Sequence, residues 1–506
     1  MTLRVGIDVG GTTTDAVVVD EADRLVAAAK AATTPQPFDG IRRALAEVTA
    51  GVDPADVTHA MLGTTHLINA LIERKGLARV GVLRLSGPAS TGLRPGVAWP
   101  TELAASIIGP TAIVGGGFEY DGSEIAPLDE PAIRRFAEQA AGRVQAVAVT
   151  GAFSMANPGH EERALSILAA ELGDDVPVSL SHMVGTLGLA ARENATILNA
   201  SVVALARRVI DGFHDALAAR GLEVESFLTR NDGTLMTAET AVRFPLLTVN
   251  ASVANSMRGA SRLADVRDAL VLDVGGTTAD LGTLVAGFPK QSTAVSQVSG
   301  VTTNFPLPEV SSIALGGGTV VSQTGDAVTI GPGSVGYRVA TESLIAGGAH
   351  ITLSDVSVRS GRRLGFGDPA LADQIPDHLA SEAMRWVEDQ IAGMVARAKV
   401  PREGLPLVAV GGGAHLVPDR VPGVDQVVRP DHHAVANAYG AAIAEVSGAI
   451  DRVFHYGREG REQCLERARD LAVDAAARAG ARRSQVRVTF VREVPLAYVT
   501  GQMCRV

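Results

Sequence analysis

Cysteine, lysine and aromatic residues are scarce in this chain of 506 residues, and long apolar runs are missing. The two cysteines, Cys464 and Cys504, have neither metal-binding nor redox spacing, which excludes a disulfide framework and fits a reducing cytoplasm. No apolar run approaches the length of a membrane span, and the chain enters a strand directly at its start. We therefore expect a cytoplasmic protein with no membrane contact and no signal peptide.

The charge balance and two absent motifs exclude further classes of protein. A formal net charge of −10 argues against nucleic acid and anionic membranes as main partners. The sequence contains no Gly-Lys dipeptide, which excludes a Walker loop, and no Gly-x-Ser-x-Gly elbow, which leaves a serine hydrolase unsupported. With 46% hydrophobic and 20% charged residues, the chain is globular and long enough for two or more domains.

One octapeptide occurs twice with a single change. Residues 8–15 read DVGGTTTD and residues 273–280 read DVGGTTAD. Each copy lies between two short apolar runs, a pattern that predicts a strand, a tight turn and a second strand. Paired glycines let the backbone turn sharply and approach a ligand closely. The duplication therefore predicts two related half-molecules that present the same loop to something between them.

The chemistry of this loop suits a phosphate group. Exposed backbone amides and threonine hydroxyls form a concavity of donors for phosphate oxygens. The predicted phosphate-binding residues are Gly10, Gly11, Thr12, Thr13, Gly275, Gly276, Thr277 and Thr278. Asp8 and Asp273 would repel a phosphate unless a divalent cation lay between, so they predict a Mg²⁺ site. The structural alternative is an ordinary hairpin turn with a capping aspartate.

Two further groups are candidate catalytic or binding residues. Asp15 and Asp280 end the two loops, where they either orient an attacking group or fix the hairpin. A third glycine run follows a predicted strand at 405–410, and we expect its residues, Gly411, Gly412, Gly413 and Ala414, to lie against the base or ribose of a nucleotide. Two phosphate loops and this run together predict ATP as the bound nucleotide.

A helix is predicted over 65–75, and Thr64, Thr65 and His66 lie at its start. A helix start is an anion site, so these residues, with Asn69 one turn further on, are candidates for substrate binding. An ordinary N-cap by Thr64 and a structural contact by Asn69 are the alternatives.

Strand-like and helix-like segments alternate along the chain, which together with the duplication predicts an α/β fold of two lobes. Helices are expected at 37–50, 187–217, 377–398, 432–447 and 458–479, and a late strand at 485–491. We divide the chain into an N-terminal lobe at 1–185, a second lobe at 186–450 and a helix–strand appendage at 451–506. A ligand is expected in the cleft between the lobes.

The order of the three glycine sites resembles that in the actin, sugar kinase and Hsp70 ATPase superfamily. Within it, the chain resembles the hydantoinase A and 5-oxoprolinase family over nearly its whole length, and its size matches a shorter branch. The supporting stretches are GTTH at 63–66, NALIERKG at 69–76, PLDE at 127–130, FS at 153–154, NP at 157–158, HE at 160–161 and GGG at 316–318. The run from 63 to 76 is the most specific of them.

The resemblance implies two ribonuclease-H-like lobes with a nucleotide cleft, and ATP-dependent opening of a cyclic amide such as a hydantoin or lactam. In such systems a B-type hydantoinase subunit often completes the hydrolysis, and related subunits serve ketone carboxylation. A small-molecule kinase and an ATP-driven conformational module acting on a partner protein are the alternatives. Association of the chain with itself stays open.

Three stretches depart from the family pattern. Glu309-Val310-Ser311 stands where the family often has Asp-x-His, so the histidine of a plausible second metal site is missing. Residues 251–254 replace a Ser-Gly-Pro-Ala loop, and residues 344–346 replace a cysteine-bearing loop. These changes affect the expected substrate more than the expected ATP-binding residues.

Overall fold

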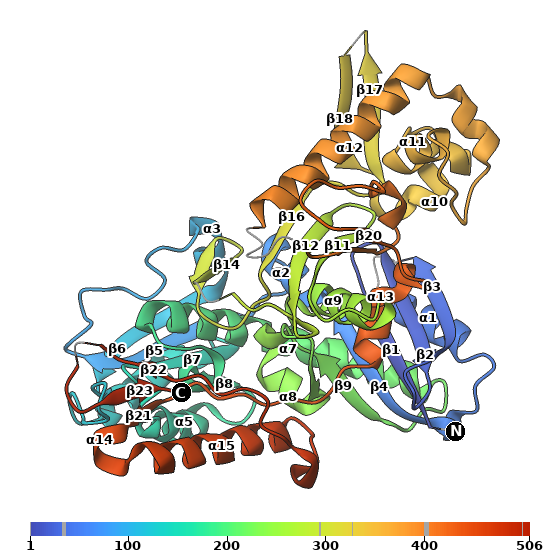
Figure 1. Cartoon of the computed structure of the whole chain (residues 1–506). Helices are drawn as coiled ribbons and strands as arrows, with labels where there is room; N and C mark the ends of the chain where they lie inside the picture. Colours follow the sequence, from blue (N-terminus) through green and yellow to red (C-terminus); the bar gives the residue numbers. More distant parts are fainter. Residues whose placement is uncertain (1, 33–36, 293–294, 326, 399–403, 498) are drawn as a thin grey trace.

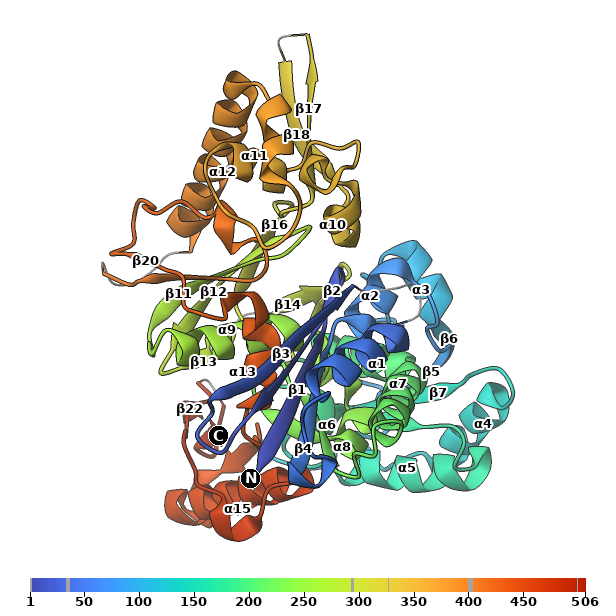
Figure 2. The same ribbon diagram turned by 90° about the vertical axis from the view of Figure 1, so that its right-hand side faces the viewer.

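A computed structural model of the chain describes residues 2–32, 37–292, 295–325, 327–398, 404–497 and 499–506 (Figure 1). Three β-sheets form the framework of the molecule. In two of them, the first two strands in chain order form one copy of the repeated hairpin. The view in Figure 2 places the β17–β18 hairpin (Thr319–Thr324, Ala327–Ser334) and helix α12 (Asp377–Arg397) at one end of the molecule. No helix among the described residues is long and apolar enough to cross a membrane.

The N-terminal sheet has six strands in the order β10-β9-β4-β1-β2-β3. They are β1 (Leu3–Val9), β2 (Thr13–Val19), β3 (Leu25–Ala32), β4 (Val57–Thr64), β9 (Glu225–Thr229) and β10 (Leu235–Thr237). The central strands are buried on both faces, which explains their continuous runs of valine and isoleucine. Helix α1 (Pro37–Val48) covers one face, and α13 (Ala436–Ala442) packs on the other.

The second sheet has the order β13-β12-β11-β19-β20, with β16 also paired to β12. Its strands are β11 (Ala269–Val274), β12 (Ala279–Val285), β13 (Phe288–Pro289), β16 (Val310–Ile313), β19 (Leu407–Val410) and β20 (Val427–Val428). In the β1–β2 hairpin Asp8 lies opposite Asp15, and in the β11–β12 hairpin Asp273 lies opposite Asp280. This repeated register confirms the expected α/β fold with two related lobes.

A third, wholly parallel sheet is inserted between β4 and β9, in the order β6-β5-β7-β8. Its strands are β5 (Val80–Gly87), β6 (Ile108–Gly115), β7 (Ala146–Gly151) and β8 (Val178–Leu180). Helix α7 (Leu189–Ala218) packs on this sheet with its first half and on the N-terminal sheet with its second half. The division at residue 185 stays a prediction; β9 and β10, which follow it, belong to the N-terminal sheet.

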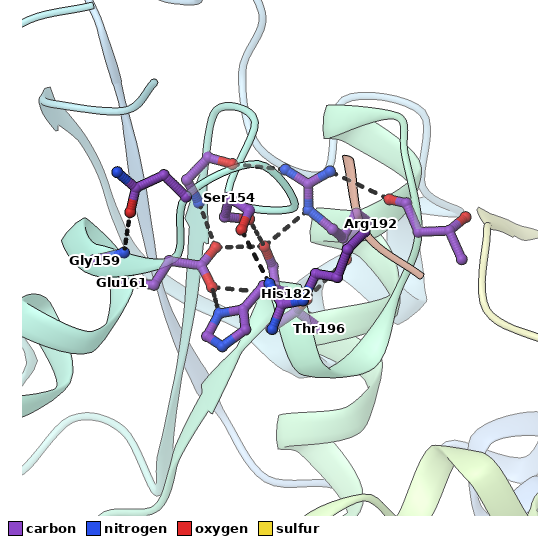
Figure 3. Close-up of polar contacts among 11 residues, drawn as sticks. Ser154, Gly159, Glu161, His182, Arg192 and Thr196 are labelled. Carbon is purple, nitrogen blue, oxygen red and sulfur yellow. Dashed lines mark hydrogen bonds and ion pairs between the residues drawn. The ribbon is translucent and has the colours of Figure 1, made fainter. Parts of the chain in front are cut away.

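A buried polar cluster fastens α7 to the parallel sheet (Figure 3). One oxygen of Glu161 accepts hydrogen bonds from the Gly151 amide at 2.7 Å and from Ser181, and the other accepts from His182 Nδ1 at 2.6 Å. Arg192 donates to Ser181 and to the Gly151 carbonyl. Burial alone would raise the pKa of Glu161, but the His182 and Arg192 contacts outweigh it and hold that pKa below its usual value.

The remaining helices and strands connect these layers. They are α2 (His66–Glu73), α3 (Thr101–Ile107), α4 (Glu130–Ala140), α5 (Gly159–Leu172), α6 (Ser181–Val184), α8 (Ala238–Arg243), α9 (Ala251–Leu263), α10 (Val339–Glu342), α11 (Leu353–Arg359), β14 (Ser296–Val298) and β15 (Val301–Thr303). In the second lobe, apolar side chains of α11 and α12 form the core with β11 and β12.

The C-terminal appendage contains α14 (Tyr456–Glu459), α15 (Arg461–Arg478) and a three-stranded sheet in the order β21-β23-β22. Its strands are β21 (Val453–His455), β22 (Val494–Pro495) and β23 (Met503–Arg505). It lies beside the carboxyl ends of the parallel sheet, where Arg452 donates to the Ser154 carbonyl and Tyr120 bonds Thr500 (Figure 1).

Two expected elements are wrong. The strand at 485–491 is absent: residues 486–491 alternate like a strand, but they lie in no sheet. The helix at 432–447 is reduced to a 3-10 turn, His433–Val435, and the seven residues of α13. It ends early because the chain beyond α13 pairs with the edge of β10, where the Leu235 amide donates to the Glu445 carbonyl at 2.8 Å.

Candidate functional site

The two repeated hairpins meet at the junction of the lobes. Their turns are the same, since the Gly10 amide donates to the Thr13 carbonyl and the Gly275 amide to the Thr278 carbonyl, each at 2.9 Å. A Cβ added to Gly276 would lie 3.0 Å from the Thr12 methyl carbon, so the tips are in contact. The structure therefore brings all eight predicted phosphate-binding residues together.

Asp8 is fully buried beneath the first hairpin. It accepts hydrogen bonds from the Ser252 hydroxyl at 2.6 Å, from Asn255 Nδ2 at 3.0 Å and from Asn437 Nδ2 at 3.1 Å. Burial nevertheless raises its pKa to about 6, because three neutral donors do not replace the lost hydration of a carboxylate.

Asp273 has fewer partners than Asp8. Its single side-chain donor is Ser256, at 2.5 Å. Burial raises the pKa of Asp273 to about 7, and the nearby charges of Asp280 and Asp8 add to the shift. Two desolvated carboxylates with raised pKa values form a site that a divalent cation would stabilise, so Asp8 and Asp273 fit the predicted Mg²⁺.

The two aspartates that end the loops have different surroundings. Asp15 forms an ion pair with Lys30 at 2.7 Å and accepts from Asn437 at 2.9 Å. Asp280 accepts from the hydroxyls of Ser312 and Thr278, and no cationic side chain among the described residues forms an ion pair with it. Burial raises the pKa of Asp280. Asp15 is thus paired with a cation within the first lobe, whereas the partners of Asp280 among the described residues are hydroxyl groups.

The donors to the two buried acids come from α9 and α13, and sequence reasoning missed them. Ser252, Asn255 and Ser256 have the i, i+3, i+4 spacing of one helix face, a signal that the sequence contains. The two helices touch through their backbones: a Cβ added to Gly259 would lie 1.9 Å from the Ala436 carbonyl oxygen. This close contact brings Asn437 of α13 to Asp8 and Asp15. Lys30 was also missed as a partner of Asp15.

The third glycine run lies against the second hairpin. A Cβ added to Gly411 would lie 2.3 Å from Asp273 Oδ1, and the Gly413 amide donates to the Val274 carbonyl at 2.7 Å. Gly412 is exposed, with open space where a side chain would be, and Ala414 is buried at the start of a 3-10 turn. A flat group could therefore approach this backbone from the solvent side.

The predicted substrate residues lie beside the first hairpin. The amide and the hydroxyl of Thr65 both donate to the Val9 carbonyl at 3.1 Å, and the His66 amide donates to the Thr64 hydroxyl at 3.1 Å. Asn69 is exposed and donates to Thr65 at 3.5 Å. Burial lowers the pKa of His66, so its ring is neutral at pH 7. A role of these four residues in substrate binding stays a prediction.

Two of the three family departures fall at the hairpins. Ser312, which follows the missing histidine position, lies opposite Asp280 in the β12–β16 pair. Ser252, in the replaced loop at 251–254, donates to Asp8. In the third, residues 344–346 form a 3-10 turn with Ile345 in the core. The described part of the chain contains no group of three or more His, Cys, Asp or Glu residues arranged to hold a metal.

Two related lobes with matching Gly-Gly hairpins at their junction define a protein with the actin-like ATPase fold. The chain belongs to the hydantoinase/oxoprolinase family. The model of that family's N-terminal region matches residues 4–172, and the hydantoinase/oxoprolinase model matches residues 192–363.

Named relatives share part of the sequence. The chain is 28% identical to the caprolactamase subunit alpha of Pseudomonas jessenii, over 71% of this chain and 54% of that protein. It is 26% identical to the acetophenone carboxylase gamma subunit of Aromatoleum aromaticum, over 71% of this chain and 53% of that protein. The chain thus spans about half the length of these relatives.

Two solved structures share the fold. The ATP-dependent caprolactamase from Pseudomonas jessenii superimposes with a TM-score of 0.69 at 23% identity, over 94% of this chain and 77% of that chain. The nucleotide-free acetone carboxylase superimposes with a TM-score of 0.69 at 19% identity, over 95% and 78%.

Proposed function

We propose that this chain is an ATP-dependent enzyme subunit that phosphorylates the amide oxygen of a cyclic amide, such as a hydantoin or lactam, before the ring is opened. The observation that carries the proposal is the meeting of two matching hairpins at two carboxylates, the buried Asp8 and the mostly buried Asp273. The relative named as a caprolactamase subunit supports the substrate class.

The residues of the junction fit ATP and Mg²⁺. Asp8 and Asp273 would hold the cation, and the amides and threonine hydroxyls of both hairpins would bind the phosphates. Residues 411–414 would contact the nucleoside. When bound, Mg²⁺ supplies positive charge that offsets the charge of the carboxylates and the phosphates. Because Thr12 touches Gly276, the lobes must separate for nucleotide to enter.

The protein would contribute to this reaction mainly by positioning the reacting groups. An amide carbon is a weak electrophile, and a phosphorylated amide oxygen is a good leaving group. The amide oxygen would bond to the γ-phosphorus as the bond to ADP breaks, and the ring N–H proton would pass to a base. Asp280 is the better candidate for that base, because Asp15 is already held by Lys30. Thr64, Thr65, His66 and Asn69 would hold the ring beside the first hairpin.

Names of relatives favour a partner and a second candidate function. Two relatives are named as subunits, so we propose that a B-type subunit completes the hydrolysis. Because relatives also include acetophenone and acetone carboxylase subunits, ATP-dependent activation of a ketone is the second candidate.

A substrate panel tests the proposal. ADP release is measured with lactams, hydantoins and ketones, with and without a B-type subunit, for the wild type, Asp273→Asn and the control Asp389→Asn on the exposed side of α12. We expect a cyclic amide to stimulate ADP release in the wild type and the control only. Stimulation by a ketone alone selects the second candidate, and Mg²⁺-independent release that Asp273→Asn leaves unchanged refutes both.

A further inference from the structure

The segment 486–492, which reads VRVTFVR, lies in no helix or strand, and its residues 487–492 are exposed. Val488, Phe490 and Val491 are 45%, 76% and 44% exposed, a local concentration of apolar side chains on the surface. Residues 487–492 form no hydrogen bond or ion pair with any described residue of the chain. The segment runs directly into β22, the edge strand of the appendage sheet (Figure 1).

An exposed strand-like segment with free amides and carbonyls is a template for pairing with another strand. Valine, threonine and phenylalanine are the residues that fit a pleated sheet best. Pairing would satisfy the backbone groups and bury the apolar side chains. The sequence of the segment indicates which strand it accepts.

The segment is complementary to itself in one antiparallel register, with the two-fold axis at Thr489. In that register Val488 of each copy lies opposite Phe490 of the other, and Thr489 lies opposite Thr489. Aromatic with β-branched pairs, and threonine pairs, are among the stabilising cross-strand pairs of antiparallel sheets. Arg487 lies opposite Val491, and Arg492 opposite Val486, so no arginine faces another arginine.

Charge complementarity supports the same register. Arg487 becomes the diagonal neighbour of Glu493 on the second copy, on the same face of the paired strands, within reach of a long side chain. Within its own chain, Glu493 is already held in place by Tyr456 at 2.8 Å and by Arg461. Because the Glu493 side chain is already ordered, it loses little further conformational entropy when a second arginine binds it.

We propose that two copies of this chain associate through antiparallel pairing of residues 486–492 about Thr489. The β22 edges of both copies then continue into one sheet, and the apolar side chains of the segment are covered. This association does not depend on the proposed reaction, since it uses only the appendage.

A cysteine cross-link tests the register. Cys464 and Cys504 are buried, so Thr489→Cys supplies the exposed thiol. Mild oxidation of the full chain is expected to give a covalent dimer on a non-reducing gel. Arg487→Cys is the matched control: the two thiols would lie four strand positions apart, about 13 Å, too far for a disulfide. Cross-linking of Arg487→Cys but not Thr489→Cys would overturn the register.

Light scattering tests the surface itself. The wild type is expected to be dimeric at micromolar concentration, and Phe490→Asp at least tenfold weaker in self-association. Val97→Asp is the control, because Val97 is 66% exposed on another part of the molecule and its change should leave the dimer intact. A monomeric wild type at 100-fold higher concentration, or a dimer unaffected by Phe490→Asp, would overturn the proposal.

Discussion

Replacing Asp273 by asparagine should stabilise the nucleotide-free protein at alkaline pH while removing its activity. Asp273 is mostly buried with one side-chain donor, Ser256, and desolvation raises its pKa from 3.8 to about 7. The folded state therefore binds more protons than the unfolded state between these two values, so stability falls as pH rises through this window. The loss is nearly complete about one pH unit above the folded-state pKa.

The size of the effect follows from the shift. Each pKa unit corresponds to about 1.4 kcal/mol, so between pH 5 and pH 8 the wild type should lose about 3 kcal/mol relative to Asp273→Asn. Asparagine keeps an oxygen to accept from Ser256, but its amide group adds two donors, and an unsatisfied donor costs about 1–3 kcal/mol. That cost does not vary with pH, so it cancels when the two pH values are compared.

The measurement is the free energy of unfolding by urea, without nucleotide or divalent cation, at several values from pH 5 to pH 8. The wild type and Asp389→Asn, which changes an exposed carboxylate on α12, should give parallel curves. Asp273→Asn should diverge upward from both as pH rises. If its curve stays parallel to that of the wild type, ionising Asp273 in the folded state has no free-energy cost. The electrostatic argument for a cation site then fails.

Three further outcomes follow from the same geometry. Asp8→Ala should abolish ATP hydrolysis with the fold retained, and wild-type turnover would contradict the metal assignment. ATP at 100 times its dissociation constant should stabilise the fold by about 2.7 kcal/mol only when Mg²⁺ is present, measured by thermal unfolding; an unchanged midpoint would count against nucleotide binding. Gly411→Ala places a Cβ 2.3 Å from Asp273 Oδ1, so it should destabilise the protein by about 1–3 kcal/mol, measured by urea unfolding without nucleotide; Gly412→Ala, whose Cβ meets open space, is the control that should leave the stability unchanged.

The sequence predicted the hairpins because their signal is local. Two glycines between apolar runs specify a tight turn, and the repeat specifies it twice, down to the Asp8–Asp15 and Asp273–Asp280 pairs. The third glycine run was predicted at the end of a strand, and it does follow β19; its position beside the second hairpin was not predicted.

Contacts between distant parts of the chain could not be predicted in this way. Asn437 meets Asp8 only because α13 packs on β1 and β2, and no periodicity in either segment encodes that packing. Lys30 lies in β3, and its ion pair with Asp15 depends on the register of β2 with β3. The strand expected at 485–491 is wrong for a related reason. An alternating sequence allows a segment to pair in a sheet, but it does not place another strand beside it.

Side chains from one turn of α9 donate hydrogen bonds to carboxylates that belong to different lobes. Ser252 and Asn255 donate to Asp8, and Ser256, one residue further on, donates to Asp273. A rotation of this helix about its own axis would withdraw donors from both sides at once. The hydrogen bonds of both carboxylates therefore depend on the orientation of this one helix.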